Sequence, residues 1–270
     1  MTTLPGTPLL RLLPPVTRAR NFRLYLADGT RLVDLWQCGG AAILGHKNSN
    51  VLRDLKNAGE RGLFAPFPHF EEKRLLKALA ALFPNKCFRI FSDKKSCENA
   101  IETANTRLNS AGGNVLKIPA EPWLPFSGFD ENQVVFRAVL PFPLAPVVLV
   151  LDKSVDNALT CSDLPPPVLT AATSRAIYNL LSNPQRGIMH FESIKRAFND
   201  ENLKKPWKLQ GIYIKPAFIA DAERWAAIFK TFLAAGYLLP PDTASPLILP
   251  AELSGGEEKT LVSLLNHTLS

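Results

Sequence analysis

The pattern of apolar and polar residues near the start of the chain predicts a β-hairpin followed by two amphipathic helices. The β-rich runs 22–26 and 31–36 flank Ala27-Asp28-Gly29-Thr30, and a central Asp-Gly is typical of tight hairpin turns. Apolar residues then recur at spacings of three and four through 50–60 and 70–82. That spacing places them on one face of a helix, so each segment is expected to bury one side.

The rest of the chain continues with short strands and helices. A fully apolar run, 147–151, is typical of a strand that is covered on both faces. Ser254-Gly255-Gly256-Glu257 has the capping-box pattern and starts a last helix that is expected to reach about residue 269. The other predicted strands are 87–91, 115–118, 134–140, 212–214, 237–239 and 247–249, and the other predicted helices are 95–108 (closed by Gly112-Gly113), 169–181, 192–198 and 221–235. This alternation indicates an α/β fold with a small α+β unit at its end.

Composition places the chain among folded globular proteins. Its 270 residues allow one large domain or two unequal ones, and 46% hydrophobic with 20% charged residues is close to the average for such domains. The 23 prolines are more than usual and gather in rigid turns such as Pro165-Pro166-Pro167. No apolar run approaches the ~18 residues of a membrane span, and 1–20 lacks the pattern of a signal peptide, so no membrane association is predicted.

The net charge of +7 raises the question of nucleic-acid binding. The basic residues are spread along the chain, and the densest group is Lys204, Lys205 and Lys208 around Trp207. This group is too short for a phosphate-binding surface, so we interpret it as solvated surface and expect no nucleic-acid partner.

The cysteines provide no metal or redox motif. The chain has four cysteines: Cys38, Cys87, Cys97 and Cys161. They show neither a CxxC pair nor metal-ligand spacing with a histidine. Free buried thiols are typical of a reducing compartment, so a cytoplasmic protein without a metal site is expected.

Motifs near both ends resemble those of one enzyme family. Residues 28–34, then Ile43-Leu44-Gly45-His46, are similar to the opening of the class III pyridoxal-phosphate (PLP)-dependent aminotransferases, in which an Asp-Gly hairpin ends in an aspartate and leads to a Gly-His turn. The segment 70–84 resembles the second helix of that family. Residues 233–250 and the capped helix resemble its closing unit, in which a Gly-hydrophobic-Pro strand pairs with a second strand. The order of these motifs, more than any one of them, carries the resemblance.

The resemblance implies a cofactor site whose parts can be sought one at a time. In the family, a Ser-Gly-Ser loop at a helix start binds the cofactor phosphate through backbone amides. Ser92-Asp93-Lys94-Lys95-Ser96 stands at the matching place, where Asp93 replaces the glycine and Lys94 and Lys95 offer compensating charge. Trp123 stands near the aromatic residue that stacks on the cofactor ring, although tryptophan among prolines is also typical of a packed loop anchor. Ser92, Lys94, Lys95 and Trp123 are thus candidate cofactor-binding residues, with a solvated helix start as the alternative.

Two further parts fall on adjacent residues. The family has an aspartate that faces the pyridine nitrogen and a lysine that forms the Schiff base, on different strands. Here Asp152 and Lys153 both follow the apolar run 147–151, so one reading makes Lys153 the Schiff-base lysine and leaves no aspartate. The other makes Asp152 the ring partner and leaves no lysine before Lys195. A polar cap on a strand end is the alternative for both residues.

Length adds to this picture, because the chain is shorter than members of the family, and nearly all of the missing residues would fall between 113 and 167. The resemblance therefore implies a three-layer PLP-transferase-like large domain with a truncated sheet, 45–185, and a small α+β domain, 186–270. The N-terminal segment and hairpin, 1–44, are expected to pack with the small domain.

The leading hypothesis is a degenerate aminotransferase-like protein without cofactor or transaminase activity, retained as a binding or assembly protein. The alternative is an active PLP-dependent aminotransferase or aminomutase with Lys153 as Schiff base, which would act on a small-molecule amino donor. A basic nucleic-acid-binding module rests on net charge alone. A homodimer is expected from the resemblance and from an apolar start that contains Leu9, Leu10, Leu12 and Leu13.

Overall fold

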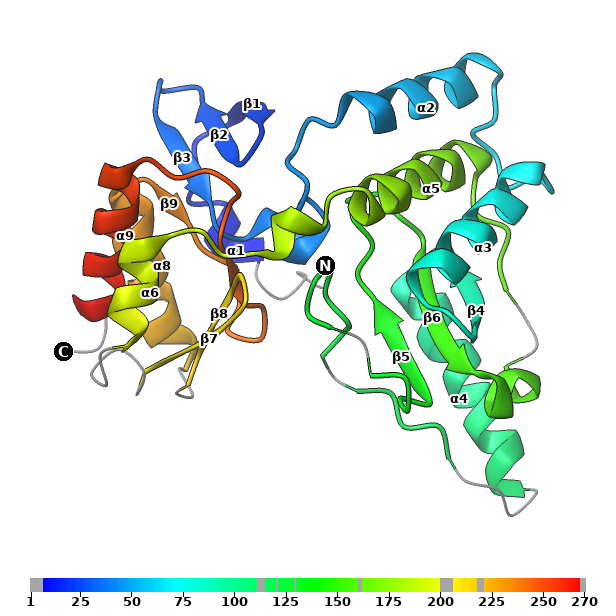
Figure 1. Ribbon diagram of the computed structural model, residues 1–270. Helices are drawn as coiled ribbons and strands as arrows, with labels where there is room; N and C mark the ends of the chain where they lie inside the picture. The colour runs from blue at the N-terminus through cyan, green and yellow to red at the C-terminus, as the bar shows by residue number, and fades with distance from the viewer. Residues whose placement is uncertain are drawn as a thin grey trace. The chain divides into compact units, whose positions relative to one another are not determined.

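A computed structural model gives the structure of the protein and describes residues 7–110, 115–119, 121–128, 130–159, 162–199, 206–217 and 221–267. The chain forms two compact units (Figure 1). The terminal unit combines Met1–Lys47 with Gln185–Ser270, and the central unit is Asn48–Pro184. Gly112-Gly113, Cys161 and Lys204-Lys205, which entered the sequence-based predictions, lie outside the described residues.

A three-stranded sheet forms the middle layer of the central unit. Its strands are β4 (Lys86–Phe91), β6 (Val147–Asp152) and β5 (Val135–Ala138), in the order β4-β6-β5. Both neighbouring pairs are antiparallel. The helices of the unit are α2 (Ser49–Glu60), α3 (Phe70–Leu82), α4 (Lys94–Ser110) and α5 (Pro167–Leu181), and Lys153–Ala158 forms the 3-10 turn η2.

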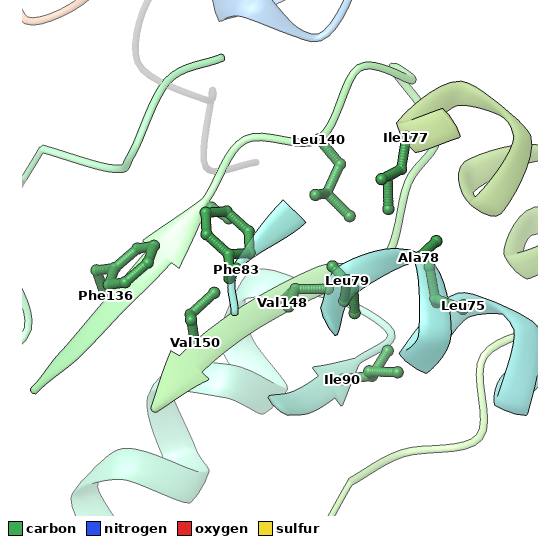
Figure 2. Packing of buried hydrophobic residues seen from close by; sticks show 11 residues of the cluster. Leu75, Ala78, Leu79, Phe83, Ile90, Phe136, Leu140, Val148, Val150 and Ile177 are labelled. Carbon is green, nitrogen blue, oxygen red and sulfur yellow. The ribbon is translucent and has the colours of Figure 1, made fainter. Parts of the chain in front are cut away.

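The helices cover both faces of this sheet because its side chains alternate in direction. Val148 and Val150 of β6 pack with α3 and α5, and Figure 2 shows them beside Leu79 and Phe136. Leu149 and Leu151 of the same strand pack on the opposite face, with α4. The strand predicted from the apolar run 147–151 is therefore confirmed as covered on both faces, and the unit has three layers.

One strand predicted for this unit is not formed. Residues 115–118 were expected to be extended and paired, but no strand pairing is present in 115–119. Instead, the Asn105 side chain of α4 accepts from the Leu116 amide at 2.8 Å and donates to the Leu116 carbonyl at 3.2 Å. The apolar pattern of 115–118 is the same as that of a strand. The backbone groups of Leu116 are nevertheless satisfied by a side-chain amide, in place of a neighbouring strand.

The terminal unit has two small sheets. The first has the order β1-β2-β3-β9, and the second has the order β10-β8-β7. The strands of the first are β1 (Val16–Arg20), β2 (Arg23–Leu26), β3 (Arg31–Asp34) and β9 (Tyr237–Leu238). Those of the second are β10 (Leu247–Ile248), β8 (Tyr213–Pro216) and β7 (Trp207–Gln210).

Parallel pairing of β3 with β9 joins the N-terminal hairpin to the C-terminal part of the chain. The predicted hairpin is confirmed as β2 and β3. The expectation that the two strands after the glycine at 236 pair with each other is wrong, because β9 pairs with β3 and β10 pairs with β8. Each short strand completes a different sheet.

Helices cover the sheets of the terminal unit, and the last of them begins with the predicted capping box. They are α1 (Thr7–Leu10), α6 (Glu192–Asn199), α8 (Ala222–Ala234) and α9 (Gly255–His267), with Gln37–Gly40 as the turn η1. At α9 the capping box is confirmed: the Ser254 amide donates to Glu257 Oε2 at 2.7 Å, and Ser254 Oγ accepts from the Glu257 amide at 3.3 Å. Trp207 is fully buried and donates its indole N–H to the Leu265 carbonyl, so its ring is a core group.

No helix within the described residues is long and apolar enough to cross a membrane. Over the same part of the chain, no group of three or more His, Cys, Asp or Glu side chains is arranged to hold a metal ion.

Candidate functional site

The start of α4, where the resemblance places a phosphate site, is occupied by carboxylates of the chain itself. Asp93 caps the helix, with Oδ1 accepting from the Ser96 amide at 2.8 Å and Oδ2 from Ser96 Oγ at 3.3 Å. The hydrogen bond from the Ser96 amide lowers the pKa of Asp93, so the cap is ionised at neutral pH. The Ser92 amide donates to Asp163 Oδ2 at 2.9 Å. Amides that would face a bound phosphate are thus already satisfied by negative groups.

The two lysines beside this cap add little free positive charge. Lys94 Nζ lies 3.4 Å from Glu98 Oε1, one helical turn further along α4. Lys95 is exposed to solvent. Because exposed ion pairs and solvated lysines are weak sources of binding energy, the start of α4 is arranged as an ordinary capped helix.

Trp123 lies on the other side of the sheet from α4. Its indole N–H donates to the Gly128 carbonyl at 2.6 Å, and its ring stands edge-on to Phe83 with centroids 4.8 Å apart. Phe83 belongs to the core layer that α3 and α5 form, shown in Figure 2. The indole is therefore packed as a loop anchor against the face of the sheet that α4 does not cover.

Asp152 and Lys153 lie at the far end of the sheet from Ser92. In the register of β4 and β6, Lys86 is opposite Asp152 and Phe91 is opposite Val147. Since a strand rises about 3.3 Å per residue, the end of β4 that leads to Ser92 is roughly 17 Å from Asp152. The structure does not bring these candidate residues together.

The local contacts of Asp152 are those of a turn and an ion pair. Its Oδ1 accepts from the Ser154 amide at 2.9 Å and from Ser154 Oγ at 2.7 Å, while Oδ2 lies 3.3 Å from Lys86 Nζ. The hydrogen bond from the Ser154 amide, more than the nearby lysine, lowers the pKa of Asp152 to about 2. Lys153 is exposed as the first residue of η2. This is the arrangement of a polar cap on a strand end.

A buried lysine in the same place was not predicted from the sequence. The side chain of Lys86 is only 3% exposed, and besides Asp152 it donates to the carbonyls of Glu131 at 2.6 Å and Gln133 at 3.0 Å. A lysine at the start of a strand is normally solvated, so nothing in the sequence indicated this burial. With its N–H groups engaged by three acceptors, Lys86 holds the 131–133 loop to the sheet and is not presented as a free amine.

The terminal unit contains a separate buried polar cluster, built from the motif that carries the N-terminal resemblance. Asp34 Oδ1 accepts from the amides of Trp36 and Gln37, each at 2.8 Å, and Oδ2 lies 2.7 Å from His46 Nε2. Asp34 is 1% exposed. The aspartate that ends the hairpin and the Gly-His turn are therefore in direct contact.

Arg186 extends this cluster to the C-terminal strands. It is 6% exposed, and its guanidinium donates to the Ile43 carbonyl at 2.8 Å, to Gln37 Oε1 at 3.1 Å and to the Leu249 carbonyl at 2.8 Å. Burial lowers the pKa of Arg186 to about 10, which still leaves it charged at neutral pH. The cluster joins three segments that are remote in sequence, 34–46, Arg186 and Leu249, and no motif in the sequence indicated Arg186.

A left-handed turn lies next to this cluster. Gln37, Cys38, Gly39 and Gly40 all have positive φ, with values of 47°, 54°, 65° and 101°. Gln37 and Cys38 carry side chains in a region that favours glycine, so their backbone is strained, and the Asp34 and Gln37 hydrogen bonds hold it in place. Cys38 is exposed at the surface of this turn.

No family model matches the sequence. Two relatives are uncharacterised proteins of spirochaetes: one of Treponema pallidum is 27% identical, covering 90% of this chain and 91% of the relative. One of Borreliella burgdorferi is 25% identical, covering 93% of this chain and 89% of the relative. These similarities extend over nearly the whole length of each protein and carry no assigned activity.

Solved structures with a similar fold include several aminotransferases. The ornithine δ-aminotransferase of Plasmodium falciparum is 10% identical with a TM-score of 0.67, over 94% of this chain and 92% of that one. An ω-transaminase of Sphaerobacter thermophilus has 12% identity and a TM-score of 0.68, over 95% and 90%. The acetylornithine aminotransferase of Elizabethkingia anophelis has 12% identity and a TM-score of 0.63, over 99% of both chains. The protein therefore has an aminotransferase-like fold, which agrees with the resemblance found in its sequence.

Proposed function

We propose that this protein is a degenerate relative of the aminotransferases that does not transaminate and acts as a binding or assembly protein. The observation that carries the proposal is the start of α4, where Asp93 and Asp163 accept the backbone hydrogen bonds that a phosphate would need. A cofactor phosphate would have to displace two carboxylates and then lie beside them. Repulsion between like charges makes that exchange unfavourable.

The positions of the other candidate residues support the same proposal. PLP chemistry requires a lysine, an acid at the ring nitrogen and an anion site within the length of one cofactor. Asp152 and Lys153 are at one end of β6 and Ser92 is beyond the other end of β4. The residues present do not fit the cofactor, so no reaction step is assigned to them.

A titration with PLP followed by absorption spectroscopy tests this proposal. An internal aldimine absorbs in the visible and near ultraviolet, at longer wavelength than the protein alone. We expect no saturable aldimine band, and no change in the spectrum when amino donors are added. A saturable band that amino donors shift would contradict the proposal and support an active aminotransferase.

We also propose that the protein is a homodimer. Three phenylalanines, two in the loop after α2 and one at the first residue of α3, are strongly exposed for apolar side chains: Phe64 at 65%, Phe67 at 56% and Phe70 at 63%. Such a group on one loop and helix start is typical of an interface, because isolated domains rarely expose contiguous aromatic surface. Leu12 near the N-terminus is also 45% exposed.

Light scattering at micromolar concentration is expected to give the mass of a dimer. Phe67→Ser should shift the protein toward monomer, because it removes an aromatic contact from the proposed interface. Leu144→Ser is the matched control, since Leu144 is 61% exposed outside this group and its replacement should leave the mass unchanged. A monomer mass for the unaltered protein would refute the proposal.

A further inference from the structure

A cavity lies beside α4, on the face of the central sheet opposite to α3 and α5. Its volume is about 620 Å³, and its apolar lining comes from Ile101 of α4, Ile118 of the following segment and Leu149 of β6. Pockets that bind small organic molecules usually have volumes of about 300–1,000 Å³. The cavity is thus large enough for a small ligand with an apolar body.

Two arginines flank Leu149 on the same face of the sheet, and among the described residues only one of them has hydrogen-bond or ion-pair partners. Leu149 is opposite Arg89 of β4 and Arg137 of β5. Arg89 donates to the carbonyls of Phe88, Asp156 and Leu159, and lies 2.9 Å from the Asp156 carboxylate. Arg137 lines the cavity and is half-buried, and its guanidinium has no hydrogen bond or ion pair to any side chain or carbonyl among the described residues.

The described groups that line the cavity with Arg137 do not supply a counter-ion. Glu98 is at the rim, 57% exposed, and is paired with Lys94 at 3.4 Å. Glu102 is exposed on the next turn of α4. Cys97 is buried beside Arg137, and desolvation raises the pKa of its thiol to about 11, so it remains neutral. A half-buried guanidinium that has no anionic partner among the described residues can pair with the carboxylate of a ligand.

We propose that this cavity binds a small organic monocarboxylate with an apolar body, whose carboxylate pairs with the Arg137 guanidinium. The planar fork of arginine matches a carboxylate in a bidentate arrangement, and the partly exposed side chains of Ile101 and Ile118 contact the apolar part. The rim acids Glu98 and Glu102 disfavour more highly charged ligands such as phosphate. This site uses none of the residues discussed for the cofactor except Lys94 at its rim, so it is independent of whether PLP binds.

Calorimetric titration with phenylacetate and its neutral analogue phenylacetamide tests the site in the unaltered protein. Both probes have the same ring, so the comparison isolates the carboxylate. We expect phenylacetate to bind saturably, and at least about tenfold more tightly than the amide, since a charge-assisted hydrogen bond usually contributes that much. Inorganic phosphate should not displace it.

Variants then locate the binding. Arg137→Met is expected to weaken phenylacetate binding by at least about tenfold. The matched control is Arg107→Met, which removes the same charge from an exposed position of α4 that does not line the cavity. Ile118→Trp, which fills the cavity without changing charge, should also abolish binding.

The proposal is overturned if phenylacetate and phenylacetamide bind equally, if neither binds saturably, or if phosphate competes. It is also overturned if Arg107→Met weakens binding as much as Arg137→Met, because the effect would then reflect overall charge. The comparison of the two probes needs no variant, so it decides the question even if Arg137→Met does not fold.

Discussion

Gly45→Ala is expected to destabilise the terminal unit by about 2–4 kcal/mol, through backbone strain and overpacking together. Gly45 has a φ of +90°, a conformation that alanine adopts only with strain. A Cβ atom would lie 3.2 Å from Asn21 Cα and 3.3 Å from the Asn21 carbonyl oxygen. The close approach is fixed, because the next amide, His46, donates to that same carbonyl at 2.8 Å.

The measurement is the free energy of unfolding in urea, with Gly29→Ala as control. Gly29 lies in the hairpin of the same unit with a φ of +85°, but a Cβ there meets nothing within 4 Å. For Gly29→Ala the free energy of unfolding should fall only by the cost of placing alanine in the left-handed conformation, about 1–2 kcal/mol. Equal losses for the two variants would mean that the contact with Asn21 contributes nothing, contrary to this account.

Arg186→Met is expected to cost a similar amount, about 2–4 kcal/mol, because buried acceptors lose their donor. Methionine fills much of the volume and keeps contact with the Phe22 ring, over which the guanidinium lies at 4.9 Å. It leaves the carbonyls of Ile43 and Leu249 and the Gln37 side chain without the hydrogen bonds that Arg186 donates. The strained turn from Gln37 to Gly40 loses support at the same time.

Denaturation of Arg196→Met gives the control for this variant. Arg196 is exposed on α6 of the same unit, and surface substitutions usually change stability by less than about 0.5 kcal/mol. If Arg186→Met were as stable as Arg196→Met, the buried cluster would not hold the terminal unit together.

Local signals in the sequence predicted the elements that depend on local physics. The helix expected over 70–82 is observed as Phe70–Leu82, because its apolar positions recur at helical spacing and a proline soon follows. The capping box at Ser254 and Glu257 is formed as its spacing implies. These features need no knowledge of distant parts of the chain.

Pairing between remote segments could not be predicted in this way. β1, Val16–Arg20, was missed because its alternating arginines and largely exposed side chains give no apolar signal. The partners of β9 and β10 depend on β3 and β8, which lie far away in sequence. Short strands pair with whatever edge the fold presents, and composition does not reveal that edge.

The geometry of the candidate site could be predicted only in part, for the same reason. The sequence showed that Asp152 and Lys153 are adjacent and that Asp93 replaces a glycine, and both observations bear on the cofactor. The register of β4 against β6, which puts Asp152 beside Lys86 and away from Ser92, required the structure. The burial of Lys86 and the lack of an ion-pair partner for Arg137 among the described residues likewise depend on neighbours from other strands.

Borohydride reduction of the protein incubated with PLP, followed by peptide mapping by mass spectrometry, tests the absence of a functional cofactor site most directly. Lys153→Ala and Lys73→Ala are mapped alongside, because Lys73 is an exposed lysine of α3, outside the candidate cofactor residues, that reports adventitious labelling. The account predicts only sparse, non-saturating pyridoxyl label, the same in all three proteins. A stoichiometric label on the Lys153 peptide, lost in Lys153→Ala and kept in Lys73→Ala, would contradict it.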